Sequence, residues 1–253
     1  MIGDPDHDTA EWLASPNFGP RRDGLSPEIL LLHYTGMATG QAAQDWLCNP
    51  QSDVSCHYIV HEDGRIVQMV READRAWHAG RAWWRGEGDI NSRSIGIEMV
   101  NFGHEGGLPP FPDRQIEAVI ALSRGIKARH AISDALVLAH SDVAPGRKID
   151  PGERFPWADL AREGVGLHVP PAPLRSGSAL REGDRGEEVA TLQATLAAHG
   201  YHVPVHGHFD QETRKVVEAF QRHFRPLRVD GEADFSTRDT LAMLSEAACR
   251  PAA

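Results

Sequence analysis

Short apolar runs separated by turn residues dominate the N-terminal part of the chain, and such runs predict β-strands. The run that ends at residue 140, for example, lies between Asp134 and a loop rich in Pro and Gly. The segments that fit are residues 29–33, 57–61, 66–70, 94–100 and 136–140. The residues Glu62, Asp63 and Gly64 predict a hairpin turn between the second and the third strand.

Helices are predicted where apolar residues recur at every third or fourth position. Residues 113–130 show this spacing at Ile116, Val119, Ile120 and Ile126. Residues 39–48 and 156–163 are the other helices predicted in this part of the chain. Together these elements predict an α/β domain in which helices flank a mixed β-sheet, with the functional site at the strand ends.

The character of the chain changes after Gly166. Residues 167–178 are rich in Pro, Ser and Gly and lack an apolar period, so they predict a linker between a domain of residues 1–166 and a second domain of residues 179–253. Helical spacing recurs in the second domain, at Val189, Leu192, Leu196, Val216, Val217, Phe220 and Phe224. It predicts a small three-helix domain, in which the similar segments GHFDQET and GEADFST each offer an N-cap residue.

Charge and cysteine content indicate which classes of partner are excluded and which cellular compartment is favoured. The formal net charge of −10 argues against nucleic acid and anionic membranes as partners. No apolar stretch is long enough to span a bilayer. Cys48, Cys56 and Cys249 show no metal-finger spacing and no disulfide framework, which favours a reducing compartment. Because the N-terminal residues do not resemble a signal peptide, we expect a cytoplasmic protein, with the periplasm as the alternative if an atypical or trimmed signal exists.

One loop, HSDVAPGRKIDPG, places candidate metal ligands close together. His140 follows an apolar run, and the Pro and Gly residues after it let the chain fold back and bring Asp150 beside His140. His33 ends another apolar run. Two histidines and an aspartate make a zinc site with one open position. Taken singly, a strand-end histidine is more often a hydrogen-bonded residue than a metal ligand, and an aspartate before Pro-Gly is usually a turn former.

Five ordered blocks carry a resemblance to a known family: LLHYTG, SCHYIVHEDGRIVQMV, AWHAG, SIGIEMVN and HSDVAPGRKIDPG. They resemble the zinc-dependent N-acetylmuramoyl-L-alanine amidases of the AmpD and AmiD type, the amidase 2 family, which shares its fold with peptidoglycan recognition proteins. The segments EVATLQATL, GHFDQETRKVVEAFQ and VDGEADFSTRDTL resemble the peptidoglycan-binding type 1 domain.

The resemblance implies roles for residues in these blocks. It implies Zn²⁺ bound by His33, His140 and Asp150. Glu98 falls at the position of the general acid/base, and its apolar strand neighbours predict a raised pKa. Lys148 falls at the position of a cation that stabilises the oxyanion. Substrate-binding positions are implied at Trp77, His78, Ala79, His57 and Asn101, although Trp77 and His57 are as easily explained as core residues.

The implied reaction is hydrolysis of the amide between N-acetylmuramic acid, with the 1,6-anhydro form expected, and L-alanine of the stem peptide, in peptidoglycan recycling. Glu87 and Asp89 make residues 81–90 acidic where we expect basic residues, so a strict preference for anhydro sugars is not implied. The alternatives are a non-catalytic muropeptide or peptidoglycan receptor and an exported wall-remodelling amidase. The full set of ligands and Glu98 favours the enzyme, which we expect to be a monomer.

Overall fold

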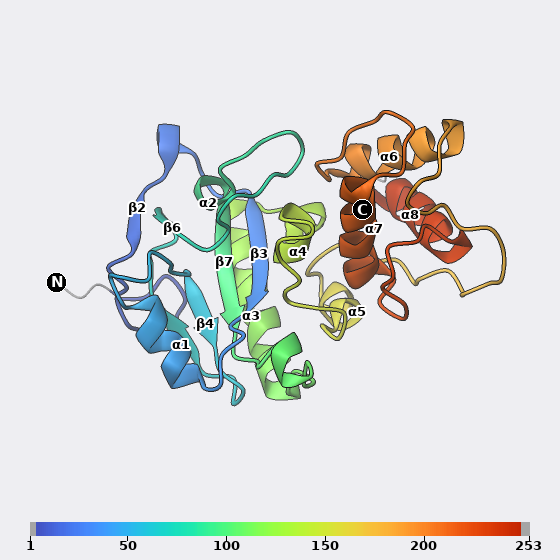
Figure 1. The fold of residues 1–253 in the computed structure, drawn as a ribbon. Helices are drawn as coiled ribbons and strands as arrows, with labels where there is room; N and C mark the ends of the chain where they lie inside the picture. The colour runs from blue at the N-terminus through green and yellow to red at the C-terminus, as the bar shows by residue number, and fades with distance from the viewer. Residues whose placement is uncertain (1–3, 249–253) are drawn as a thin grey trace.

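A six-stranded mixed β-sheet forms the centre of the N-terminal lobe in this computed structural model, which describes residues 4–248 (Figure 1). The strand order is β1-β5-β4-β7-β3-β8, and all neighbours are parallel except β4 and β5. The strands are β1 (Glu11–Trp12), β3 (Ile29–Tyr34), β4 (Tyr58–Val60), β5 (Ile66–Gln68), β7 (Ser94–Met99) and β8 (Val137–Ala139). A separate antiparallel pair consists of β2 (Phe18–Pro20) and β6 (Asp74–Ala76).

Alternation along β3 assigns its residues to the two faces of the sheet. Leu30 and Leu32 belong to the buried cluster that packs under α3, whereas Ile29 and Leu31 belong to the cluster on the opposite face. His33 continues the second series, so its side chain lies on the face with Ile29 and Leu31. The strand therefore ends with a histidine directed away from the α3 side.

Helices cover both faces of the sheet, which confirms the predicted fold class. The helices of this lobe are α1 (Gly40–Leu47), α2 (Ile90–Arg93), α3 (Asp113–His130), α4 (His140–Val143) and α5 (Trp157–Arg162), with 3-10 turns at Arg22–Gly24, His104–Gly106 and Asp134–Leu136. The prediction for α3 matches the observed bounds, and Thr39 caps α1 by accepting a hydrogen bond from the backbone N–H of Ala42. No helix within residues 4–248 has the length and apolar character needed to cross a membrane.

The predicted strand of residues 136–140 is wrong at both ends. Strand β8 begins at Val137 and stops at Ala139, and His140 is the first residue of α4. The cause is a side chain further along: the Asp142 carboxylate accepts a hydrogen bond from the backbone N–H of Ala139 at 2.8 Å, which turns the chain into a helix. Sequence patterns also missed the short strands β1, β2 and β6.

The C-terminal module consists of α6 (Glu187–His199), α7 (Gln211–Phe224) and α8 (Phe235–Ala248), as the three-helix prediction expects. Its two similar segments make the same contacts. Asp210 accepts hydrogen bonds from the backbone N–H and the hydroxyl of Thr213, and Asp234 does the same for Thr237. These bonds satisfy backbone donors at the starts of α7 and α8.

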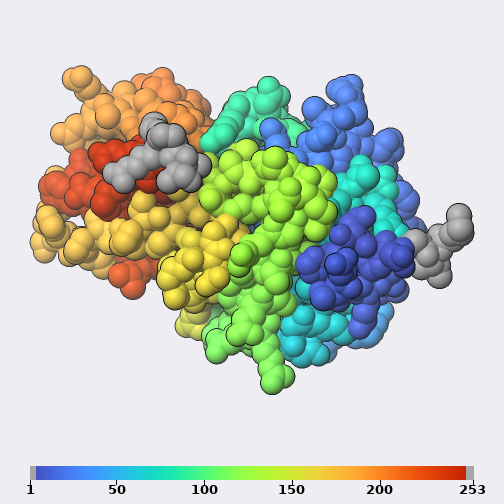
Figure 2. Space-filling model, turned by 180° about the vertical axis from the view of Figure 1, so that it is seen from behind, coloured from blue at the N-terminus to red at the C-terminus, as the bar shows by residue number. Residues whose placement is uncertain are grey.

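The two lobes share one buried core. Ile29, Leu31 and Trp84 belong to the same hydrophobic cluster as Val217 and Phe220 of α7. Figure 2 shows the C-terminal module, in orange and red, directly against the yellow and green segments of the N-terminal lobe. Residues 167–178 also contact the module, since Ser236 donates a hydrogen bond to the carbonyl of Ala172 at 2.5 Å. The module is thus packed on the N-terminal lobe by apolar burial, which is the main stabilising force in such contacts.

Candidate metal centre and active-site cleft

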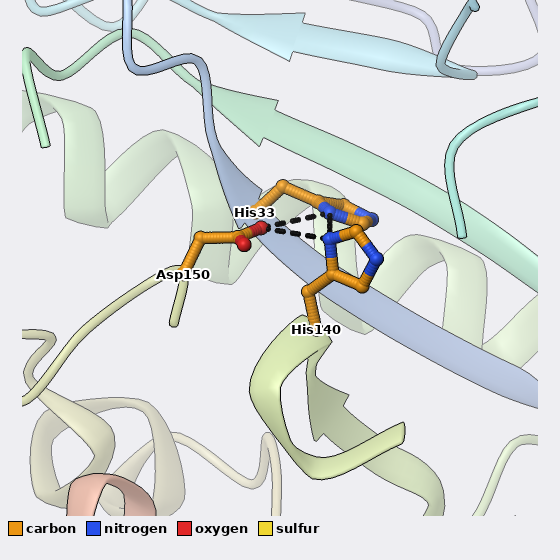
Figure 3. Close-up of side chains that lie close together, drawn as sticks. All are labelled: His33, His140 and Asp150. Carbon is orange, nitrogen blue, oxygen red and sulfur yellow. Dashed lines mark hydrogen bonds and ion pairs between the residues drawn. The ribbon is translucent and has the colours of Figure 1, made fainter. Parts of the chain in front are cut away.

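Three side chains from distant parts of the sequence converge at one edge of the sheet (Figure 3). His33 comes from β3, His140 begins α4, and Asp150 lies on the following loop, which folds back as predicted. The two Nδ1 atoms lie 2.9 Å apart, and Oδ2 of Asp150 lies 3.1 Å from Nδ1 of His33 and 3.0 Å from Nδ1 of His140. All three residues are buried.

The backbone fixes the orientation and the tautomer of His140. Its Nε2 lies 3.1 Å from the carbonyl oxygen of Ala79, which can only accept a hydrogen bond. Nε2 must therefore carry the proton, and Nδ1 presents a lone pair to His33 and Asp150. A carbonyl that orients a histidine in this way is common next to metal ligands.

A chain of side chains fixes the tautomer of His33. The hydroxyl of Ser94 donates to the carbonyl of Ile90 at 2.6 Å, so its oxygen accepts from Nε2 of His78 at 3.3 Å. Nδ1 of His78 is then the acceptor for Nε2–H of His33, at 3.0 Å. His33 consequently presents the lone pair of its Nδ1 to His140. The ring of His78 packs directly over Gly96 of β7. A Cβ at this position would lie 2.5 Å from Nδ1 of His78, so glycine leaves the space that the ring occupies.

The converging atoms form a donor set for a cation. Two unprotonated nitrogens and a carboxylate oxygen at about 3 Å repel one another unless a positive charge lies among them. Burial lowers the pKa of His33 to about 4, which keeps it neutral. Two imidazoles and one carboxylate, with further positions open to the cleft, are a donor set that fits zinc.

Glu98 lies beside the cluster and has an unusual environment. It is the register partner of His33 in the parallel pair β3 and β7, so the two side chains project from the same face. Its Oε2 is buried and has no hydrogen-bond partner. Burial raises its pKa well above the ordinary value, Asp150 adds to the rise, and Lys148 opposes it. A carboxyl group with a raised pKa is suited to accept and return a proton during a reaction.

A cavity of about 320 Å³ opens beside the cluster. Glu98, Lys148, Trp77 and His78 all line it. Among the described residues, the ammonium group of Lys148 has no hydrogen-bond or ion-pair partner, so its charge faces the cavity. The cavity therefore combines a candidate metal site, a proton carrier and, within the described residues, an unpaired cation.

Comparison with known proteins decides the family. The profile of the family described as N-acetylmuramoyl-L-alanine amidase matches residues 23–153, and that of a putative peptidoglycan binding domain matches residues 185–241. The N-acetylmuramoyl-L-alanine amidase AmiD of Escherichia coli is 38% identical over 231 residues, which cover 87% of this chain and 82% of AmiD. The chain belongs to the N-acetylmuramoyl-L-alanine amidase family.

Other relatives of this amidase agree. The 1,6-anhydro-N-acetylmuramyl-L-alanine amidase AmpD of Escherichia coli is 31% identical over 166 residues, which cover 59% of this chain and 88% of AmpD. The solved structure of AmiD with anhydro-N-acetylmuramic acid-L-Ala-D-gamma-Glu-L-Lys has a TM-score of 0.74 at 37% identity, covering 88% of this chain and 91% of AmiD. The solved structure of AmpDh3 from Pseudomonas aeruginosa with anhydromuramic pentapeptide has a TM-score of 0.71 at 27% identity. The match covers 97% of this chain and 98% of AmpDh3.

Three residues expected at the substrate do not line the cavity of the amidase. His57 is fully buried, and its Nδ1 accepts a hydrogen bond from the backbone N–H of Gly96 at 2.9 Å. Ala79 is also fully buried, and its carbonyl oxygen accepts a hydrogen bond from Nε2–H of His140. Asn101 is buried as well, and its side-chain amide donates a hydrogen bond to the carbonyl of Pro109 at 2.9 Å. These residues form the layer that supports the cleft, since their polar atoms are already paired.

The cavity of the amidase also has walls that sequence reasoning did not assign. Tyr34, Trp46 and Arg147 line it, and each lies close in sequence to a predicted element or residue. Trp46 is 49% exposed and projects from α1, where its helical spacing alone gave no sign of a role. Tyr34 and Arg147 adjoin His33 and Lys148 in the quoted motifs, and this adjacency was the available signal.

Proposed function

We propose that this amidase hydrolyses its substrate amide with a zinc ion held by His33, His140 and Asp150. The observation that carries the proposal is the pair of Nδ1 lone pairs 2.9 Å apart beside a carboxylate. When bound in such a site, zinc lowers the pKa of water and polarises a carbonyl group. The chain's own residues supply the proton transfers and the positioning.

Glu98 is the proton carrier in this proposal. Its unpaired Oε2 accepts a proton from the attacking water, and its raised pKa lets the carboxyl group hold that proton until the amine leaves. The same oxygen then donates the proton to the nitrogen of L-alanine, so the departing group is a neutral amine. Glu98 returns to its starting charge at the end of the cycle.

Lys148 stabilises the charge that develops on the carbonyl oxygen. Its side chain lines the cavity, and its ammonium group has no partner among residues 4–248, so it is free to pair with an oxyanion. Trp77 and His78 lie on the wall and are proposed to contact the muropeptide. The receptor alternative requires neither an unpaired carboxyl group nor an unpaired cation beside the cluster.

The proposed substrate is a soluble 1,6-anhydromuropeptide. Relatives crystallised with anhydromuramic peptides, and the AmpD name itself, support this choice. We also propose a cytoplasmic location, which the free thiols of Cys48 and Cys56 support because they suit a reducing compartment. The exported wall-remodelling alternative differs in its substrate, so substrate preference decides between them.

Peptide release from soluble anhydromuropeptide and from intact sacculi tests these points. Each substrate is assayed with the metal-free protein and after zinc is added back. The proposal expects zinc-dependent release that is faster from the soluble substrate, with Glu98→Gln as the inactive control that still binds zinc. Faster cleavage of sacculi supports the wall-remodelling alternative, and binding of muropeptide without zinc-dependent release supports the receptor.

A further inference from the structure

Asp142 connects the two lobes of the molecule. It lies in α4, two residues after His140, and its side chain is fully buried. Oδ1 accepts a hydrogen bond from the hydroxyl of Tyr201 at 2.7 Å, and Oδ2 accepts from Nδ1–H of His223 at 2.6 Å and from the backbone N–H of Ala139 at 2.8 Å. Two of these donors belong to the C-terminal part of the chain, since Tyr201 follows α6 and His223 lies in α7.

Helix α4 cannot hold its own shape. It spans only four residues, and isolated helices of that length are unstable because nucleation is costly. The Asp142 cap at Ala139 holds its first turn. Backbone bonds from Ala144 to His140 (3.1 Å), from Ser141 to Asp150 (3.0 Å) and from Trp83 to Val143 (2.9 Å) connect it to itself and to neighbouring segments. A buried carboxylate that loses a donor is strongly destabilised, so the cap depends in turn on the other donors.

Packing fixes the donors from the C-terminal module. The ring of His223 stacks between Trp157 of α5 and Phe224, with ring centroids 3.7 and 3.8 Å away. Tyr201 is buried edge-on against Trp84, at 5.0 Å between ring centroids. These rings leave the two donors little freedom to move away from Asp142.

Helix α7, which carries His223, also packs against the loop after α4. Gly146 has a φ of +72°, and a Cβ at this position would overlap the side chain of Lys215 from α7. This loop carries Lys148 and Asp150. Helix α7 therefore contacts both chain segments that bring residues from beyond β8 to the candidate metal centre.

We propose that Asp142 is a positioning residue, held by Tyr201 and His223, through which the C-terminal module orients α4 and thereby Nδ1 of His140. The effect on zinc binding rests on the function proposed above. The effect on the conformation of α4 does not depend on that function. In this arrangement the module is part of the scaffold of the metal centre, in addition to any contact it makes with peptidoglycan. Loss of a donor loosens α4 and weakens metal binding without changing a residue that touches substrate.

Variants of the full-length chain test this. Tyr201→Phe removes one hydroxyl and keeps the ring, and His223→Leu removes the second donor while keeping an apolar side chain of similar size. Two quantities are measured: amide hydrogen exchange of residues 139–144 in the metal-free protein, relative to amides of α3, and the zinc dissociation constant by competition with a chelating dye. Each variant is expected to speed exchange in α4 and to raise the zinc dissociation constant about tenfold, as for other supporting contacts of metal ligands.

Two controls separate positioning from general stability. His223→Asn restores an N–H near the position of Nδ1 and is expected to return both quantities toward wild type. Leu244→Ala opens a cavity in α8 without removing a donor to Asp142, so it should lower the free energy of unfolding and leave both quantities unchanged. In the zinc-bound variants, kcat should fall while KM stays near wild type.

Two results would overturn the inference: wild-type exchange in α4 with both Tyr201→Phe and His223→Leu, or an equal effect of Leu244→Ala. Failure of the wild-type protein to bind zinc is a different outcome. It would reject the proposed metal chemistry, and hydrogen exchange in the metal-free protein would still decide whether the module positions α4.

Discussion

The Nε2 atom of His33 lies 3.0 Å from Nδ1 of His78, and this contact sets which nitrogen of His33 faces the candidate metal centre. Because His78 is itself oriented by Ser94, the acceptor in this pair is Nδ1 of His78. A residue that the family resemblance assigns to the substrate groove thus also supports a proposed metal ligand.

Replacement of His78 by Leu should weaken zinc binding. The change removes the acceptor for Nε2–H of His33, so the tautomer with a lone pair at Nδ1 loses its stabilisation. We expect the zinc dissociation constant, measured by chelator competition, to rise ~10-fold or more. Ser94→Ala is the graded control and should have a smaller effect, because it only loosens the orientation of His78. Equal zinc affinity in wild type and His78→Leu would contradict the role given to this contact.

Gly96→Ala should damage the same contact through crowding. The added Cβ would lie 2.5 Å from Nδ1 of His78 and must displace that ring, although the backbone of Gly96 is compatible with alanine. We expect zinc affinity and kcat/KM each to fall ~10-fold. Gly19→Ala is the matched control, because a Cβ at Gly19 meets nothing within 4 Å. A crystal structure of Gly96→Ala with His78 unmoved would show that the argument is wrong.

The parts of the structure that sequence predicted are those controlled by local periodicity. Helix α3 has the predicted bounds because its apolar spacing is long and regular. The approach of Asp150 to His140 followed from the Pro and Gly residues between them, since these force the loop to turn back. Such features depend on neighbours in sequence.

The parts that were missed depend on contacts between distant residues. The start of α4 at His140 is set by Asp142, which looks like an ordinary turn residue until Tyr201 and His223 surround its carboxylate. Strand β1 is two residues long and exists only because β5 pairs with it. His57 matched a family block, but only the packing of β4 against β7 shows that it is buried. No local pattern encodes these relationships.

Glu98→Gln should abolish turnover without releasing the metal. Glutamine keeps the shape of the side chain but cannot accept the proton of the attacking water, so we expect kcat to fall ~10²–10⁴-fold. Zinc content, measured by elemental analysis, should match wild type because Glu98 is not among the three converging ligands. Near-normal turnover by Glu98→Gln would move the role of proton carrier to another residue.

Stability of the metal-free protein should fall as the pH drops below 6.5, and buried histidines outside the metal centre should contribute. Burial lowers the pKa of His199 to about 4 and that of His57 to about 3. In the unfolded chain, a histidine has a pKa of about 6.5 and binds a proton below that pH, whereas the buried histidine of the folded protein stays neutral. Stability is therefore complete above that value and is lost as the pH falls toward the folded pKa, by ~1.4 kcal/mol per pH unit for each such group.

His199→Gln isolates one of these contributions. Urea unfolding is measured with a chelator present between pH 8 and pH 5, so that release of metal does not add to the pH dependence. We expect the unfolding free energy to change less steeply with pH below about pH 6.5, because glutamine does not bind a proton in the unfolded chain. An unchanged slope in His199→Gln would mean that residue 199 is protonated in the folded state, despite its burial among Trp84, Tyr201 and Phe224.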